Sequence, residues 1–199
     1  MVYRLDDEMD GQVNDWIADL EKADINIRQR ARRRLIAYEG DIAKRMIDVM
    51  CEEQGRRSWE AAIILSERHE VSALNAMKQM LVSRHPVLGQ IAAETLAGYG
   101  TRFLDDLIAA LPISTYLTQI AIISVLERIG DQRAVAPLMA FVQTVTTPML
   151  IYTSLRALGA LGDPSAIDLI RRYLKHEDAH VLKRARMALQ ELEKESRSE

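Results

Sequence analysis

Cysteine is nearly absent from the sequence, and this absence excludes two kinds of site. Cys51 is the single cysteine among 199 residues, so the chain can form neither an internal disulfide nor a metal site of the CxxC type. We interpret Cys51 as a packing residue. A chain without disulfides is typical of a reducing compartment, and we therefore expect a cytoplasmic location.

Long apolar runs and a net positive charge are also missing. No stretch approaches the roughly 20 consecutive apolar residues that a helix needs to span a bilayer. The opening MVYRLDDEMD is acidic and polar, unlike the apolar core of a secretion signal. The formal net charge of −3 gives no overall field that would attract nucleic acid. We expect no association with membranes.

Aromatic residues are scarce, at 5% of the chain, whereas alanine, leucine, isoleucine, arginine and glutamate are abundant. This balance favours helices over strands. The sequence contains no glycine-rich phosphate loop, no Ser-His-Asp set and no nucleotide-binding fingerprint. We therefore expect a helical protein that is not an enzyme and that needs no cofactor.

Leucine recurs with a period of about 31 residues, which indicates an internal repeat. The spacings between six successive leucines are 30, 31, 30, 32 and 31. These leucines, called anchor leucines below, are Leu35, Leu65, Leu96, Leu126, Leu158 and Leu189. Gly100, Gly130 and Gly162 follow three of them by four residues and suit the left-handed residue that ends a helix. In the first two repeats, Glu39 and His69 stand in place of this glycine.

Each repeat is predicted to contain two helices, because a lone helical hairpin cannot bury its apolar face and must stack on its neighbours. We expect one domain, 1–199, with repeats at 12–40, 41–70, 71–100, 101–130, 131–162 and 163–195. The first helices are predicted at 12–22, 41–53, 71–83, 102–111, 133–143 and 164–174. The second helices are predicted at 26–38, 57–68, 86–99, 114–129, 148–161 and 179–195. Pro86, Pro148 and Pro164 support three of these helix starts.

Four segments carry a resemblance to a known family. GDQRAVAPLMAFV (130–142) and GDPSAIDLIRRYL (162–174) resemble the first helix of the short HEAT-like repeats of phycobilin lyases. LRALGALGD (155–163) and VLERIGD (125–131) are similar to the second helix of that repeat. The resemblance implies an all-α fold, a right-handed α-solenoid (α-α superhelix) of about six HEAT-like helical hairpins. It does not name a function, because such repeats serve many roles.

The second helices of such a solenoid are expected to line a concave face. Residues two, six or seven positions before an anchor leucine would lie on this face, and several of them are apolar where polar residues would be ordinary. Aromatic side chains beside arginine favour protein binding, and an apolar groove suits an amphipathic helix or an extended peptide. The predicted partner-binding residues are Trp59, Ile63, Gln90, Glu94, Gln119, Ile120, Ile151, Tyr152, Arg156, Lys183 and Met187. The alternative is a register shifted by one residue, which would place several of them in the core.

A dense basic segment lies within the first repeat. Arg28, Arg30, Arg33 and Arg34 are predicted as an anion-binding set that could contact phosphates. The alternative is a solvated terminal helix whose charge is offset by the acidic residues between 15 and 24.

The segment from His176 to His180 reads H-E-x-x-H, which binds zinc when it lies on one continuous helix. The repeat places 175–179 in the turn between two helices instead. We therefore interpret the match as chance and expect no metal.

The function predicted from the sequence is that of a non-catalytic scaffold or adaptor, which binds a protein or peptide segment on its concave face. Two alternatives stay open. One is a lyase-like or chaperone protein for a cofactor-bearing partner, and the other is nucleic-acid binding through the helix that contains 28–34.

Overall fold

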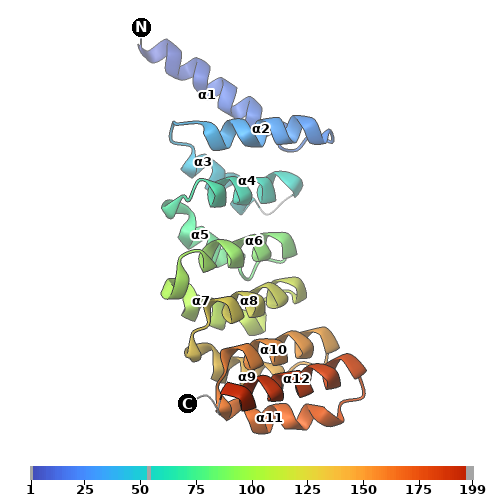
Figure 1. Ribbon diagram of the computed structural model, residues 1–199. Coiled ribbons are helices and arrows are strands. Elements are labelled where there is room, and N and C mark those ends of the chain that lie inside the picture. Colours follow the sequence, from blue (N-terminus) through green and yellow to red (C-terminus); the bar gives the residue numbers. More distant parts are fainter. Residues whose placement is uncertain (1, 53–54, 196–199) are drawn as a thin grey trace. The chain divides into compact units, whose positions relative to one another are not determined.

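The computed structural model describes residues 2–52 and 55–195, and every regular element within them is a helix (Figure 1). The all-α prediction of a solenoid of helical hairpins is confirmed. Cys51 is exposed at the end of its helix, so the interpretation of this residue as packing was wrong.

The observed helices follow the predicted alternation. The second helices are α2 (Ile25–Ala37), α4 (Gly55–Glu67), α6 (Pro86–Ala97), α8 (Tyr116–Ile129), α10 (Pro148–Leu161) and α12 (Ala179–Glu195). The first helices are α1 (Val2–Asp19), α3 (Ala43–Cys51), α5 (Leu74–Met80), α7 (Leu104–Ala110), α9 (Val135–Val142) and α11 (Ile167–Arg172). Short 3₁₀ turns flank several of them: η1 (Val71–Ala73), η2 (Gly100–Phe103), η3 (Leu111–Ile113), η4 (Gln132–Ala134), η5 (Pro164–Ala166) and η6 (Tyr173–Lys175).

Most helix boundaries differ from the predicted ones by a few residues, and the start of α1 differs most. Helix α1 begins at Val2, ten residues before the predicted start at 12. Helix α3 ends at Cys51, and residue 53, the last of the predicted range 41–53, lies outside the described residues.

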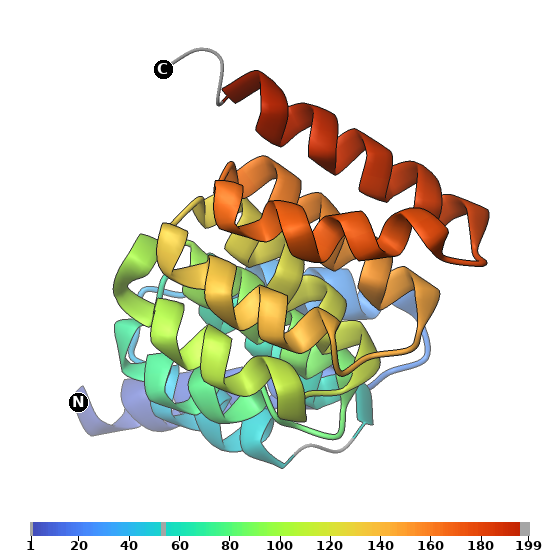
Figure 2. The same cartoon turned by 90° about the horizontal axis from the view of Figure 1, so that it is seen from below.

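The chain forms two compact units, residues 1–92 and residues 93–199, with the division inside α6. In the first unit, α2 packs against α1 and α4, and α3 packs against α4. In the second unit, α10 packs against α8, α9 and α12. Figure 1 shows α8, α10 and α12 in one layer of that unit and α9 and α11 in the other. Figure 2 shows α11 directly beneath α12, with which it is in contact.

The six anchor leucines are all buried in the core. Burying a leucine side chain stabilises a fold by about 1.5–3 kcal/mol. The anchors therefore supply a regular share of the packing energy to every repeat.

A Gly-Asp pair forms two of the joints between repeats. Gly130 ends α8 with φ +72°, and Gly162 ends α10 with φ +76°, both in the left-handed region. The carboxylate of Asp131 then accepts from the backbone N–H of Arg133 at 2.9 Å. Asp163 accepts in the same way from Ser165 at 2.8 Å. In each pair, the glycine ends one helix and the aspartate caps the start of the next.

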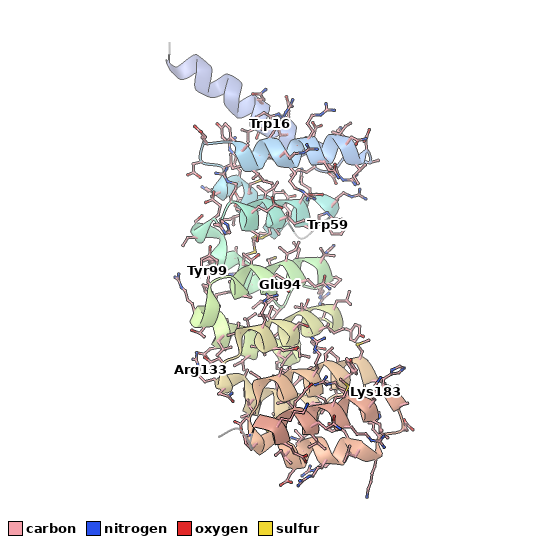
Figure 3. All side chains as sticks on the ribbon, in the orientation of Figure 1. Trp16, Trp59, Glu94, Tyr99, Arg133 and Lys183 are labelled. Atoms are coloured by element: carbon pink, nitrogen blue, oxygen red, sulfur yellow. The ribbon has the colours of Figure 1, made fainter. Side chains whose placement is uncertain are left out.

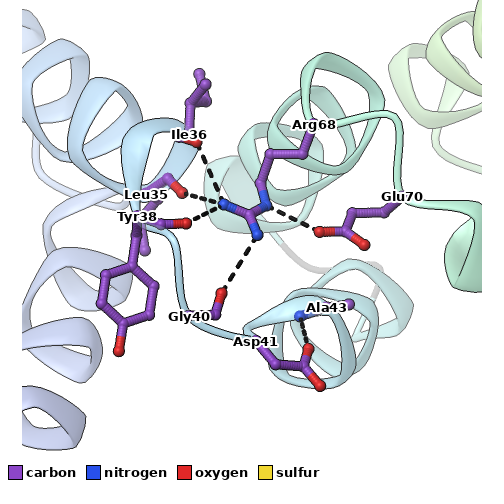
Figure 4. A network of polar contacts seen from close by, with 8 residues as sticks. All are labelled: Leu35, Ile36, Tyr38, Gly40, Asp41, Ala43, Arg68 and Glu70. Carbon is purple, nitrogen blue, oxygen red and sulfur yellow. Dashed lines mark hydrogen bonds and ion pairs between the residues drawn. The ribbon is translucent and has the colours of Figure 1, made fainter.

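The joint after α2 lacks this glycine, and Arg68 from the end of α4 takes over its role (Figure 4). The Arg68 side chain is largely buried and forms an ion pair with Glu70 at 2.9 Å. Its guanidinium donates to the carbonyl oxygens of Leu35, Ile36, Tyr38 and Gly40. The carbonyl groups at the end of α2, which have no partner within the helix, are thus satisfied by a cation from the next repeat.

We expect Arg68→Ala to lower the free energy of unfolding by about 2–3 kcal/mol, because it leaves partly buried carbonyl groups without a donor. Arg68→Lys keeps the charge but loses the fork of donors, and it should fall between alanine and wild type. Urea unfolding measures both variants. Wild-type stability of Arg68→Ala would contradict the capping role.

Gly159 allows close contact between α10 and α12. A Cβ atom at this position would lie 3.0 Å from both Cα and Cβ of Ala188 on α12, and it would also meet the Glu191 carboxylate. Such a distance is tighter than ordinary packing, so the two helices would have to move apart.

We expect Gly159→Ala to destabilise the protein by about 1–3 kcal/mol through this overpacking. Gly11→Ala in α1 is the matched control, because nothing lies within 4 Å of the added Cβ. Alanine has the higher helix propensity, so the control should gain about 0.5–1 kcal/mol. Opposite signs in urea unfolding are the expected result, and a neutral Gly159→Ala would contradict the close contact.

Candidate partner-binding surface

An open hollow of about 620 Å³ lies in the second unit, between the first turns of α10 and α12. Its lining residues are Thr147, Pro148, Met149, Tyr152, Asp178 and His180. Pro148 opens α10, where a missing N–H costs nothing and the fixed φ suits a helix. Pro148 at the start of α10 and Asp178 just before α12 therefore both line the hollow.

Asp178 positions the start of α12. Its carboxylate accepts from the backbone N–H groups of His180 at 2.8 Å and Val181 at 3.1 Å, while its own N–H donates to Nδ1 of His176 at 3.0 Å. The hydrogen bond from Val181, together with the one from His180, holds the pKa of Asp178 below its ordinary value of 3.8, although burial acts in the opposite direction. The carboxylate therefore serves as a helix cap.

The same geometry places the H-E-x-x-H segment in a turn. Helix α12 begins at Ala179, so His176 and His180 do not share one face of a continuous helix. Among the side chains that the structure describes, no group of three or more His, Cys, Asp or Glu residues is arranged to hold a metal ion.

Large apolar side chains are exposed at the starts of α8 and α10. Met149 is 50% exposed and lines the hollow. Ile113, at 70%, comes just before α8, and Tyr116 and Leu117 in its first turn are also exposed. Leu117, Met149 and His180 each stand nine positions before an anchor leucine. Since α10 packs against both α8 and α12, these equivalent positions form a row across three first turns.

This row was not among the predicted partner-binding residues, because those lie two, six or seven positions before an anchor leucine and the row lies nine positions before it. A signal was present in the sequence: an apolar residue directly after a helix breaker, as in Pro148-Met149.

The predicted residues of the second unit fall into three groups. Ile151 is only 3% exposed and belongs to the core, so its placement on a binding surface was wrong. It lies one residue, about 100° of helix rotation, from Tyr152. The half-buried residues are Gln119, Ile120, Tyr152 and Arg156. The exposed residues are Glu94 on α6 and Lys183 on α12, which are labelled in Figure 3, and Met187 on α12.

Two of these residues link neighbouring second helices. Arg156 on α10 donates to Glu127 at 2.8 Å and to Ser124 at 3.2 Å, both on α8. Arg128 on α8 donates to Glu94 at 2.6 Å. Such half-exposed ion pairs add about 0–1 kcal/mol each. Lys183 has no ion-pair partner among the described residues, and its charge is available to a ligand.

The first unit places Trp59 and Ile63, both half-buried, beside a smaller open hollow of about 250 Å³. The Trp59 ring packs edge-on against His85, with ring centroids 5.5 Å apart. Arg32 also lines this hollow, but its Nε donates to Glu60 at 2.7 Å. Gln90, the remaining predicted residue of this unit, is half-buried on α6.

Comparison with known proteins gives one result about the second unit. Residues 104–190, which run from the start of α7 into α12, match a family model described as HEAT repeats. The match supports the prediction of a HEAT-like repeat protein, but it does not identify the repeats as the phycobilin-lyase type. No curated protein matches the sequence. None of the described helices is both long and apolar enough to cross a membrane.

The capping role of Asp178 predicts a stability difference that depends on pH. The lowered pKa means that the ionised cap stabilises the fold above pH 3.8, and this contribution is lost as the pH falls below 3.8 through the folded-state pKa. We therefore expect Asp178→Asn to be less stable than wild type near neutral pH and equally stable in strong acid. Urea unfolding between about pH 6 and about pH 2 measures the difference. A difference that does not change with pH would contradict the role of the charged cap.

Proposed function

We propose that this HEAT-like repeat protein is a non-catalytic scaffold or adaptor, which binds a segment of a partner protein on the second-helix layer of its second unit. HEAT repeats commonly mediate protein–protein interaction. The observation that carries the proposal is the row of exposed apolar residues along the first turns of α8 and α10, next to the 620 Å³ hollow.

The chemistry of this surface suits a peptide. Met149 and Tyr152 offer an adaptable apolar wall and an aromatic ring with a polar tip. Ile120 and Met187 extend the apolar area along α8 and α12. A groove between parallel helix starts accepts the apolar side chains of an amphipathic helix or an extended strand, with polar contacts at the rim.

The proposal of a non-catalytic role rests on the polar groups of the hollow. Asp178 is committed to the start of α12 through two backbone N–H groups. His180 is exposed, and the lining of the hollow contains neither a serine nor a cysteine beside it. We place the protein in the cytoplasm because its only cysteine leaves no disulfide to form. The relationship of these repeats to those of phycobilin lyases is proposed from the resemblance in sequence alone.

The test uses peptides selected on the wild-type protein from a random 16-residue display library. Affinity for the best peptides is then measured by isothermal calorimetry for Tyr152→Ala combined with Ile120→Ala. Removing the side chains of Tyr152 and Ile120 should weaken binding by about tenfold or more. Because these two side chains are largely apolar, the wild-type affinity should change little with salt concentration.

The control removes two exposed apolar residues of the first unit, Val71 and Val82, by substitution with alanine. This variant should bind the selected peptides as the wild type does. Peptides whose affinity is unchanged by the Tyr152 and Ile120 substitutions, or is lowered equally by the control, would place the binding surface elsewhere.

A further inference from the structure

Helix α2 carries five arginines within seven residues, and two of them have structural roles. Arg28 donates to the carbonyl oxygens of Lys22 at 2.8 Å and Ala23 at 2.7 Å, just after α1. Arg32 pairs with the buried Glu60 of α4. Arg28, which is one of the predicted anion contacts, thus holds the turn between α1 and α2 through one nitrogen of its guanidinium.

The other three arginines form a separate surface, called the α2 arginine stripe below: Arg30, Arg33 and Arg34. They line an open hollow of about 450 Å³ together with Asn26 and Ala37. All three are exposed, and their spacing of three and four residues places them on one face of the helix. The guanidinium of Arg34 lies 5.7 Å from the centre of the Trp16 ring, which restricts its motion.

No carboxylate among the described residues neutralises this stripe. Arg30, Arg33 and Arg34 form no ion pair with a side chain of residues 11–52 or 55–194. The nearby Asp24 caps α2 by accepting from the N–H of Asn26 at 2.7 Å. Among the side chains and backbone groups that the structure describes, Arg33 has one polar contact, a long one from its Nε to the carbonyl oxygen of Gln29 at 3.4 Å. The acidic residues of 15–24 therefore do not offset the stripe by direct pairing.

Unpaired like charges three and four residues apart destabilise a helix. Solubility does not require them on one face, because the chain already carries a net charge of −3. An anionic ligand would neutralise the repulsion between these arginines, and the relief of that repulsion would favour binding.

We propose that the α2 arginine stripe binds the phosphodiester backbone of a nucleic acid, independently of its sequence. Guanidinium forks match the oxygen pairs of phosphate, and Asn26 adds an amide donor. The lining of the hollow has no large apolar side chain, so it lacks the desolvated anchor that a protein partner would use. This site lies in the first unit and does not depend on the function proposed for the second.

The test measures binding of a fluorescent DNA duplex of about 20 base pairs and of an RNA strand of equal length at about 50 mM salt. The variant is R30Q/R33Q/R34Q. The control is R84Q/R172Q/R186Q, which removes the same charge from exposed arginines outside the stripe. We expect the stripe variant to lose about tenfold or more in affinity, and its log–log salt slope to fall by about 0.9 for each lost duplex contact. The control should stay close to wild type.

A third variant, R30K/R33K/R34K, keeps the charge and loses the forks, so it should bind with intermediate affinity. Thermal melting checks that the variants remain folded, and if the stripe variant melts early, the single substitution R30Q on the helix surface replaces it. No binding by the wild-type protein at low salt would overturn the proposal. So would equal losses in the stripe and control variants, or stripe-dependent binding to polyglutamate or anionic vesicles without binding to either nucleic acid.

Discussion

A helical hairpin has one apolar face and nothing of its own to cover it, and this constraint governs both units of the chain. The face is buried only when the next hairpin stacks against it with equivalent residues in contact. The anchor leucines are the visible result, since all six are buried although their neighbours in sequence differ widely. Pairwise stacking then determines which side chains remain for a ligand.

What remains in the second unit is the outer side of the second-helix layer. Its helix starts are fixed by breakers such as Pro148 and by the Asp178 cap, so the residues of the first turns are held in place without being buried. Exposed apolar residues held by such rigid elements lose little conformational freedom when they bind. In the first unit, α2 leaves arginines exposed instead, and the two units consequently expose surfaces of different chemistry.

The period of the sequence was sufficient to predict the alternation of helices and the glycines that end α8 and α10, because each depends on residues close together in the chain. Side-chain orientation was harder to predict. Ile151 and Tyr152 are adjacent, yet one is core and the other faces the hollow, because the helix rotates by about 100° per residue. The roles of Arg28 and Arg68 depend on carbonyl groups of other helices or turns, which no local pattern indicates.

The cap on α2 makes the two ends of the repeat series unequal. Helices α8 and α10 end at glycines of their own repeats. The carbonyl groups at the end of α2 are instead capped by Arg68, which belongs to the second hairpin. The first hairpin therefore depends on its neighbour for its terminus, and cooperativity in this unit is directional: opening the second repeat also frays the first. Amide hydrogen exchange would show this as matched opening free energies in the last turns of α2 and α4.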